Sequence, residues 1–310
     1  MNKIQLRQYV SLIKTEWPNL TEEMIEKDYY LSLFLTRMYS SKQTEFKNLI
    51  FKGGTLLSKL YLNYHRISED LDFTYIRSNY IRTLLTNKQI DKKIKVIQHK
   101  LIEEIKNISN PPFIFYSEKH PSLNYISMRN KRIICFFYVY FESLYSIDKI
   151  SQIKVEINFI ENQIKSPVNK KLLNLVDLYK NKLLLKSLNF DIETVNLLVY
   201  NLDEIILEKY RAILTRKQIK ERDLFDLYLI NKTKDVFKVK NNEILNKVSS
   251  SFKFLPKTKD FYNVNLKNIK NNKIEITQDI SNLSIIKYET QDFINFKNKV
   301  FKKLNTLEFI

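Results

Sequence analysis

The stretch FKGGTLLSKLYLNYHRISEDLDF, residues 51–73, carries the strongest structural signal of the sequence. It contains both glycines of the 310-residue chain, Gly53 and Gly54. In a chain so poor in glycine, the pair indicates backbone that cannot tolerate a Cβ, through positive φ or close approach of a ligand. Leucines recur at helical spacing after the pair, which places it at a helix N-terminus, where free N–H groups can hold a phosphate. A simple loop-to-helix turn is the alternative interpretation.

An acidic strand is predicted directly after this helix, at residues 70–73. Asp70 and Asp72 alternate with Leu71 and Phe73, so a strand places both carboxylates on one face and both apolar side chains on the other. The two carboxylates repel each other, and a divalent cation would relieve that repulsion. Mg²⁺ prefers one or two carboxylates together with substrate phosphate oxygens, which suits this pattern. Solvated charges on an exposed strand face are the alternative.

A third carboxylate lies on a later predicted strand, QIKVEINFI at residues 152–160. Val155, Ile157 and Phe159 share one face of this strand and leave Glu156 on the other. If this strand lies next to the acidic strand, Glu156 can complete a metal site; otherwise it is a solvent-facing residue of an edge strand. A phosphate-holding glycine pair, a helix, two aspartates and a later carboxylate together are typical of metal-assisted nucleotidyl transfer.

Composition limits the class of protein. The formal net charge is +18, from 52 Lys and Arg against 34 Asp and Glu, which favours polyanionic partners such as RNA or nucleotides. An AT-rich genome also favours lysine and asparagine codons, so the positive charge is only weak support for a polyanionic partner. No apolar run approaches the ~18 residues of a membrane span, and charges occupy the N-terminal region where a signal peptide would be apolar. We expect a cytoplasmic protein that does not act on membranes.

Three separated blocks of the chain, at residues 26–35, 53–73 and 202–230, resemble the AbiEii/AbiGii family of nucleotidyltransferase toxins, members of the polymerase-β-like superfamily. The first signature, Gly-Gly-Thr, a helix with Lys, then Arg-x-Ser-x-Asp-x-Asp, matches Gly53, Gly54, Thr55, Lys59, Arg66, Ser68, Asp70 and Asp72. The later signature matches Glu208, Lys209, Ala212, Arg216, Arg222, Asp223 and Asp226.

The resemblance implies Mg²⁺-dependent transfer of a nucleotide from an NTP to an acceptor, in similar toxins the 3′ end of tRNA, which halts translation. Such toxins usually accompany a separate antitoxin, often in abortive infection and phage defence. Asp70, Asp72 and Glu156 would hold the metal and act in catalysis with Lys209 and Asp223. Nucleotide binding would fall to Gly53, Gly54, Thr55, Lys59, Arg66, Ser68 and Asp226. Nucleotide transfer to a protein side chain and a catalytically silent nucleotide-binding regulatory module are the alternatives.

The expected fold is α+β, with a polymerase-β-like nucleotidyltransferase core whose mixed sheet is flanked by helices, followed by a mostly helical C-terminal domain. We expect a nucleotidyltransferase domain with N-terminal helices at residues 1–166. Residues 167–310 would form the second domain and contribute Lys209 and Asp223 to the site. The lysine-rich segment 231–310 could grip an RNA backbone or an antitoxin, or simply present solvated helix faces.

Overall fold

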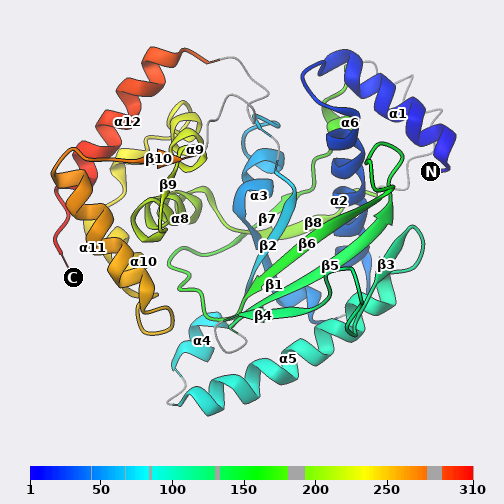
Figure 1. Ribbon diagram of the computed structural model, residues 1–310, viewed down its shortest axis with the longest axis horizontal. Helices are drawn as coiled ribbons and strands as arrows, with labels where there is room; N and C mark the ends of the chain where they lie inside the picture. The colour runs from blue at the N-terminus through cyan, green and yellow to red at the C-terminus, as the bar shows by residue number, and fades with distance from the viewer. Residues whose placement is uncertain are drawn as a thin grey trace. The chain divides into compact units, whose positions relative to one another are not determined.

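The computed structural model describes residues 1–42, 44–66, 68–83, 86–129, 133–180, 193–277 and 288–309 (Figure 1). The chain forms two compact units. The first comprises Met1–Glu161 and Pro167–Val199, and the second comprises Asn162–Ser166 and Tyr200–Ile310. The first unit therefore extends beyond the predicted boundary at residue 166.

The first unit is a mixed sheet with helices. Its helices are α1 (Lys3–Glu16), α2 (Glu22–Ser40), α3 (Gly53–Leu60), α4 (Ser78–Thr83), α5 (Asn87–Ile108) and α6 (Leu175–Leu178), with a 3₁₀ turn at Phe46–Asn48. Its strands are β1 (Leu49–Lys52), β2 (Asp70–Tyr75), β3 (Phe113–Phe115), β4 (Ser127–Arg129), β5 (Ile134–Glu142), β6 (Ile150–Asn158), β7 (Val168–Lys171) and β8 (Asn196–Val199).

The strands follow the order β3-β5-β6-β2-β1-β8-β7, and β4 also pairs with β5. The pairs β2–β6 and β1–β8 are parallel, whereas the remaining pairs of this sheet are antiparallel. Because β8 pairs with β1 and β7 pairs with β8, the segment that carries them belongs to this sheet. This pairing explains why the first unit continues to Val199.

Local sequence features explain where α2 begins and how β2 is oriented. Helix α2 begins behind Thr21, whose Oγ1 accepts a hydrogen bond from the Met24 N–H, as expected of an N-cap residue. The apolar side chains Leu71 and Phe73 of β2 are fully buried. Helix α2 covers the same apolar face, since Tyr30 stacks on Phe141 of β5 with ring centroids 4.0 Å apart. Asp70, Asp72 and Glu156 lie on the opposite face.

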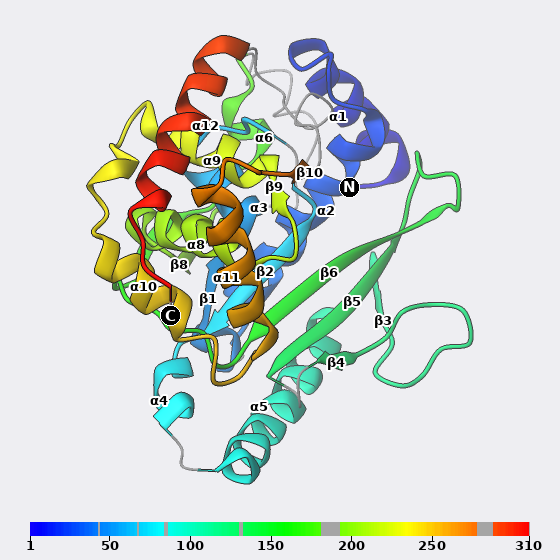
Figure 2. The same cartoon turned by 60° about the vertical axis from the view of Figure 1, so that its left-hand side comes forward.

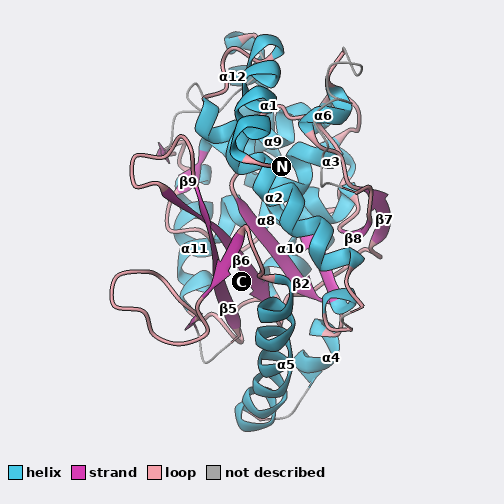
Figure 3. Cartoon of the chain, turned by 90° about the vertical axis from the view of Figure 1, so that its right-hand side faces the viewer, coloured by secondary structure: helices cyan, strands magenta, loops and turns pink. Residues whose placement is uncertain are grey.

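The second unit is mainly helical (Figure 3). Its elements are α8 (Leu202–Thr215), β9 (Ile219–Lys220), α9 (Glu221–Asn231), a 3₁₀ turn at Val236–Lys238, α10 (Asn241–Ser249), α11 (Lys257–Lys270), β10 (Ile276–Thr277) and α12 (Thr290–Asn305). Asn201 is the N-cap of helix α8, and its Oδ1 accepts from the Glu204 N–H at 2.9 Å. None of the helices in the described ranges is long and apolar enough to cross a membrane.

Candidate active site

The two glycines form the first residues of α3, directly after β1. Gly53 has a φ of +82°, and a Cβ on it would overlap the Asp72 carboxylate. A Cβ on Gly54 would lie 2.5 Å from Arg66 Nη2 and 2.9 Å from Ser68 Oγ. At Gly53, positive φ and the close Asp72 carboxylate both exclude a Cβ, as predicted. Phosphate binding by the glycine pair stays a prediction.

The loop before β2 is fastened to the first turn of α3. Thr55 Oγ1 donates to the Asp70 carbonyl oxygen at 2.5 Å and lies 2.9 Å from Ser68 Oγ. One turn later, Ser58 Oγ donates to the Arg66 carbonyl oxygen at 2.6 Å. These contacts bring the glycines, Thr55, Arg66 and Ser68 together at the N-terminal end of one helix, where the helix dipole favours an anion.

The three predicted metal carboxylates lie on neighbouring strands. Asp72 on β2 is directly paired with Glu156 on β6, and one alternation earlier Asp70 is paired with Lys154. Burial and the adjacent Glu156 carboxylate raise the pKa of Asp72 to about 6, although Lys52 across the β1–β2 pair opposes the shift. Negative charge is thus in excess at Asp72, which is half-buried.

Asp70 already has a cationic partner. Lys154 Nζ lies 3.2 Å from Asp70 Oδ2, and although burial acts in the other direction, the Asp70, Glu156 and Asp72 charges raise the pKa of Lys154. Within the described part of the chain, no three acidic, histidine or cysteine side chains are gathered closely enough to form a metal-binding group. The carboxylate oxygens of Asp70, Asp72 and Glu156 are of the donor type that a hard divalent cation prefers, and they come from two neighbouring strands.

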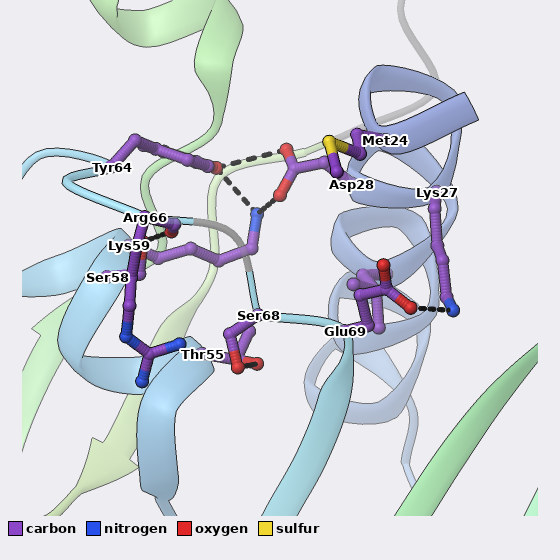
Figure 4. Close-up of a pocket in the computed structure, with 11 residues that line it drawn as sticks. Met24, Lys27, Asp28, Thr55, Ser58, Lys59, Tyr64, Arg66, Ser68 and Glu69 are labelled. Atoms are coloured by element: carbon purple, nitrogen blue, oxygen red, sulfur yellow. Dashed lines mark hydrogen bonds and ion pairs between the residues drawn. The ribbon is translucent and has the colours of Figure 1, made fainter. Parts of the chain in front are cut away.

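Lys59 takes a different position from the one expected of a nucleotide-binding residue. It is 1% exposed, and its Nζ lies 2.5 Å from Asp28 Oδ1, 2.6 Å from the Tyr64 hydroxyl and 2.9 Å from Ser32 Oγ. Figure 4 shows Lys59 directed towards Asp28 and Tyr64. Desolvation lowers the pKa of Lys59, while Asp28 opposes this. In this position, Lys59 fastens the loop after α3 to α2.

This cluster borders a cavity of about 10 Å³, no larger than one water molecule. The neighbouring lysine of α2, Lys27, donates to Glu69 Oε2 at 2.5 Å. No pattern in the sequence indicated that Ser32 and Tyr64 would share the Lys59 ammonium group with Asp28. Strand alternation places Lys154 on the same face as Glu156, but it did not indicate that Lys154 would pair with Asp70.

In the second unit, helices α8 and α9 bring the later signature together. Lys209 Nζ donates to Asp223 Oδ1 at 3.0 Å and also to Asp226, while Arg216 donates to Asp223. Burial alone would raise the pKa of Asp223, but the Lys209 and Arg216 charges lower it below its usual value. Asp226 is 0% exposed. A second buried ion pair, between Glu204 and Lys247, carried no recognisable signal in the sequence.

The geometry of both units can now be set beside known proteins. A family model described as the nucleotidyl transferase AbiEii toxin of a type IV toxin–antitoxin system matches residues 34–306. No curated protein matches the chain. Among solved structures, the chain is similar to MenT4, a nucleotidyltransferase toxin from Mycobacterium tuberculosis H37Rv. The TM-score is 0.52 at 16% identity, covering 96% of this chain and 90% of that one.

The protein JHP933 from Helicobacter pylori also matches, with a TM-score of 0.46 at 16% identity, covering 92% of this chain and 93% of that one. The likeness to MenT4 supports the fold, a mixed sheet flanked by helices. The family model spans most of the chain. The predicted resemblance and fold class are confirmed, and this chain belongs to the AbiEii family of nucleotidyltransferase toxins of type IV toxin–antitoxin systems.

Proposed function

We propose that this toxin transfers a nucleotide from an NTP to an RNA acceptor, the 3′ end of tRNA, and thereby blocks translation in the cytoplasm during phage defence. A separate antitoxin would restrain it. The single observation that carries this proposal is the position of Asp72, which lies against Gly53 at the start of α3 and beside Glu156 on the next strand. A triphosphate held at the helix start would therefore lie next to the carboxylates.

The first turn of α3 would bind the phosphates. Free N–H groups at a helix start and the helix dipole favour a phosphate, and Gly53 and Gly54 allow it to approach the backbone. Arg66 Nη2 and Ser68 Oγ border this point, so they would bind phosphate oxygens together with Thr55. Lys59 would support nucleotide binding through the loop that it fastens, because its ammonium group is surrounded by Asp28, Ser32 and Tyr64.

Asp70, Asp72 and Glu156 would hold Mg²⁺ as the cofactor, which stabilises the negative charge of the reacting phosphate. To bind the metal ion, the Asp70 carboxylate would give up its ion pair with Lys154. The acceptor hydroxyl oxygen attacks the α-phosphorus in line, the bond to the bridging oxygen breaks, pyrophosphate leaves and the hydroxyl proton passes to water. Lys209 would offset triphosphate charge, with Asp223 and Asp226 orienting its ammonium group.

The test is incubation of the protein with each labelled NTP, Mg²⁺ and total tRNA. We expect labelled RNA with the wild type and a rate at least about a hundredfold lower with Asp72→Asn, because several kcal/mol of charge stabilisation is lost. Asp148→Asn is the matched control, since Asp148 is an exposed aspartate of the same unit. Omission of Mg²⁺ should abolish labelling in both the wild type and this control.

Three results would contradict the proposal. Absence of labelled RNA with every NTP, or equal labelling by Asp72→Asn, removes its basis. Label that migrates with a polypeptide would identify a protein side chain as the acceptor. NTP binding without release of pyrophosphate would identify a catalytically silent nucleotide-binding module.

A further inference from the structure

A hollow of about 420 Å³ lies beside β5, in the first unit. Its volume is in the range of pockets that take small organic ligands. Figure 2 shows the loop between β3 and β4 extending from the sheet next to β5. The hollow is lined by Leu123, Asn124, Tyr125, Ile126, Ser127, Met128 and Tyr138.

Tyr138, which lines the hollow, lies on the same face of the sheet as the acidic residues. Tyr138 on β5 is paired with Lys154 on β6, and Lys154 is paired with Asp70 on β2. Directly paired residues of neighbouring strands project from the same face of a sheet. Tyr138 and Asp70 are therefore two strand spacings apart, about 10 Å, on one face.

The hollow is built into the strand pattern. Strand β5 pairs with β3 from Val139 to Phe141 and with β4 from Ile134 to Phe136, so Tyr138 lies between the two pairings. The intervening loop is fixed over this point, since the Tyr140 hydroxyl donates to the Asn124 carbonyl oxygen at 2.9 Å. A pocket whose walls are already held in place binds a ligand with little cost in ordering.

The lining combines aromatic and apolar surface with cations at its border. Tyr138 is half-buried, and Tyr125 and Met128 are each 37% exposed. Next to the lining residues, the Arg129 guanidinium on β4 and the Lys154 ammonium on β6 lie 4.9 Å and 5.3 Å from the centre of the Phe136 ring. Aromatic faces next to Lys and Arg are the combination that binds single-stranded nucleic acid, through base stacking and phosphate contacts.

We propose that this hollow binds an unpaired nucleobase of the acceptor RNA, stacked on Tyr138, with Arg129 and Lys154 beside the adjoining phosphate. The inference rests on the proposed function, because it takes RNA as the acceptor. It adds the side chains that would recognise the unpaired 3′ tail of such an acceptor, Tyr138 together with Arg129 and Lys154. Because the base would be recognised by stacking on the Tyr138 ring, the hollow would accept different bases.

The test compares two RNA hairpins that are identical except for a short unpaired 3′ tail on one of them, with binding measured in the absence of NTP. We expect the wild type to prefer the tailed hairpin. Tyr138→Ala should weaken binding of the tailed hairpin about tenfold, as loss of one stacked base predicts, and leave the blunt hairpin unchanged. Tyr138→Phe retains the ring and should retain the preference.

Tyr80→Ala is the matched control, because Tyr80 is a 55% exposed tyrosine on α4 of the same unit. It should bind both hairpins as the wild type does. Thermal unfolding of every variant checks that the fold is intact, and Tyr125→Ala on the rim of the hollow provides a second variant that should weaken binding of the tail.

Several results would overturn the inference: no preference for the tail in the wild type, unchanged preference in folded Tyr138→Ala and Tyr125→Ala, or a loss confined to NTP affinity. The labelling assay distinguishes this failure from that of the proposed function. If Tyr138→Ala labels tRNA with an unchanged KM for tRNA, the proposed role of the hollow is wrong and the proposed transfer reaction stands. If the preference for the tail depends on Tyr138 but the wild type labels no RNA, the result supports binding in the hollow and contradicts the proposed transfer reaction.

Discussion

The two carboxylate clusters of this toxin differ in the charges that face them. In the first unit, Asp72 lies beside a second carboxylate, Glu156, and its pKa is raised to about 6 by burial and by that neighbour. In the second unit, Asp223 lies beside Lys209 and Arg216, and these cations lower its pKa despite its burial. One cluster has an excess of negative charge, whereas the other is neutralised.

The difference in charge indicates different roles: the first cluster is suited to bind a cation, whereas the second stabilises the fold. A carboxylate with a raised pKa is destabilised in its ionised form, so the fold gains when a proton or a metal cation arrives. A buried ion pair already has its counter-charge, and removal of one partner leaves an uncompensated charge in the core. We therefore expect substitutions in the two clusters to have opposite effects on stability.

The largest expected effect on stability is that of Lys209→Met. It removes the ammonium group from Asp223 and from the fully buried Asp226, and the free energy of unfolding should fall by about 3–5 kcal/mol. Urea unfolding followed by circular dichroism measures this change. The double variant Lys209→Met/Asp226→Leu is the control, since apolar replacement of a buried pair is close to neutral.

The double variant also tests the proposed catalytic role of Lys209. If it folds as the wild type does and still labels RNA at the wild-type rate, Lys209 only stabilises the second unit. Unchanged stability of Lys209→Met would contradict the comparison of the two clusters.

The next effect is a pH dependence that comes from Asp72. Its pKa is about 6 in the folded chain against an ordinary 3.8, so between these values the folded state binds more protons than the unfolded state. Stability contributed by this group should therefore rise as the pH falls from about 6 to about 4, by at most about 3 kcal/mol. Unfolding free energies of the wild type and Asp72→Asn, measured without metal across this range, give the contribution as their difference.

Asp223 should act with the opposite sign. Its pKa is lowered in the fold, so its contribution is present above its ordinary pKa and is lost as the pH falls further. A constant difference between the wild type and Asp72→Asn from pH 4 to pH 7 would contradict the raised pKa.

A smaller effect is expected for Gly53→Ala. A side chain at a φ of +82° costs about 1–2 kcal/mol, and the added Cβ would also displace the Asp72 carboxylate. Both thermal stability and RNA labelling should fall. Gly54→Ala is the comparison: it lacks a positive φ, and its Cβ meets only the ends of the Arg66 and Ser68 side chains. Equal stability of Gly53→Ala and the wild type would contradict this account.

The smallest effect is expected for Lys27→Ala, which removes an ion pair with Glu69. The Glu69 side chain is 48% exposed, and exposed pairs contribute about 0–1 kcal/mol. Unfolding should shift by no more than this amount, and RNA labelling should match the wild type. A loss of labelling in this variant would place Lys27 in the site.

The sequence was informative wherever a signal is local. Residue spacing predicted the helix that follows Gly53 and the alternation of β2, because dihedral preferences and side-chain alternation act over a few residues. It did not indicate that Pro167–Val199 belongs to the first unit. That assignment depends on the pairing of β8 with β1, a contact between segments that no local pattern specifies.

The sequence by itself determined where a Cβ is excluded, which side chains share a strand face and which family the chain belongs to, because these follow from residue identity and spacing. Only the tertiary structure decided which charges meet. Strand register set Glu156 beside Asp72 and Lys154 beside Asp70, and packing surrounded Lys59 with Asp28 and Tyr64. Electrostatic energies depend on distance and burial, and both are fixed only when remote segments come together.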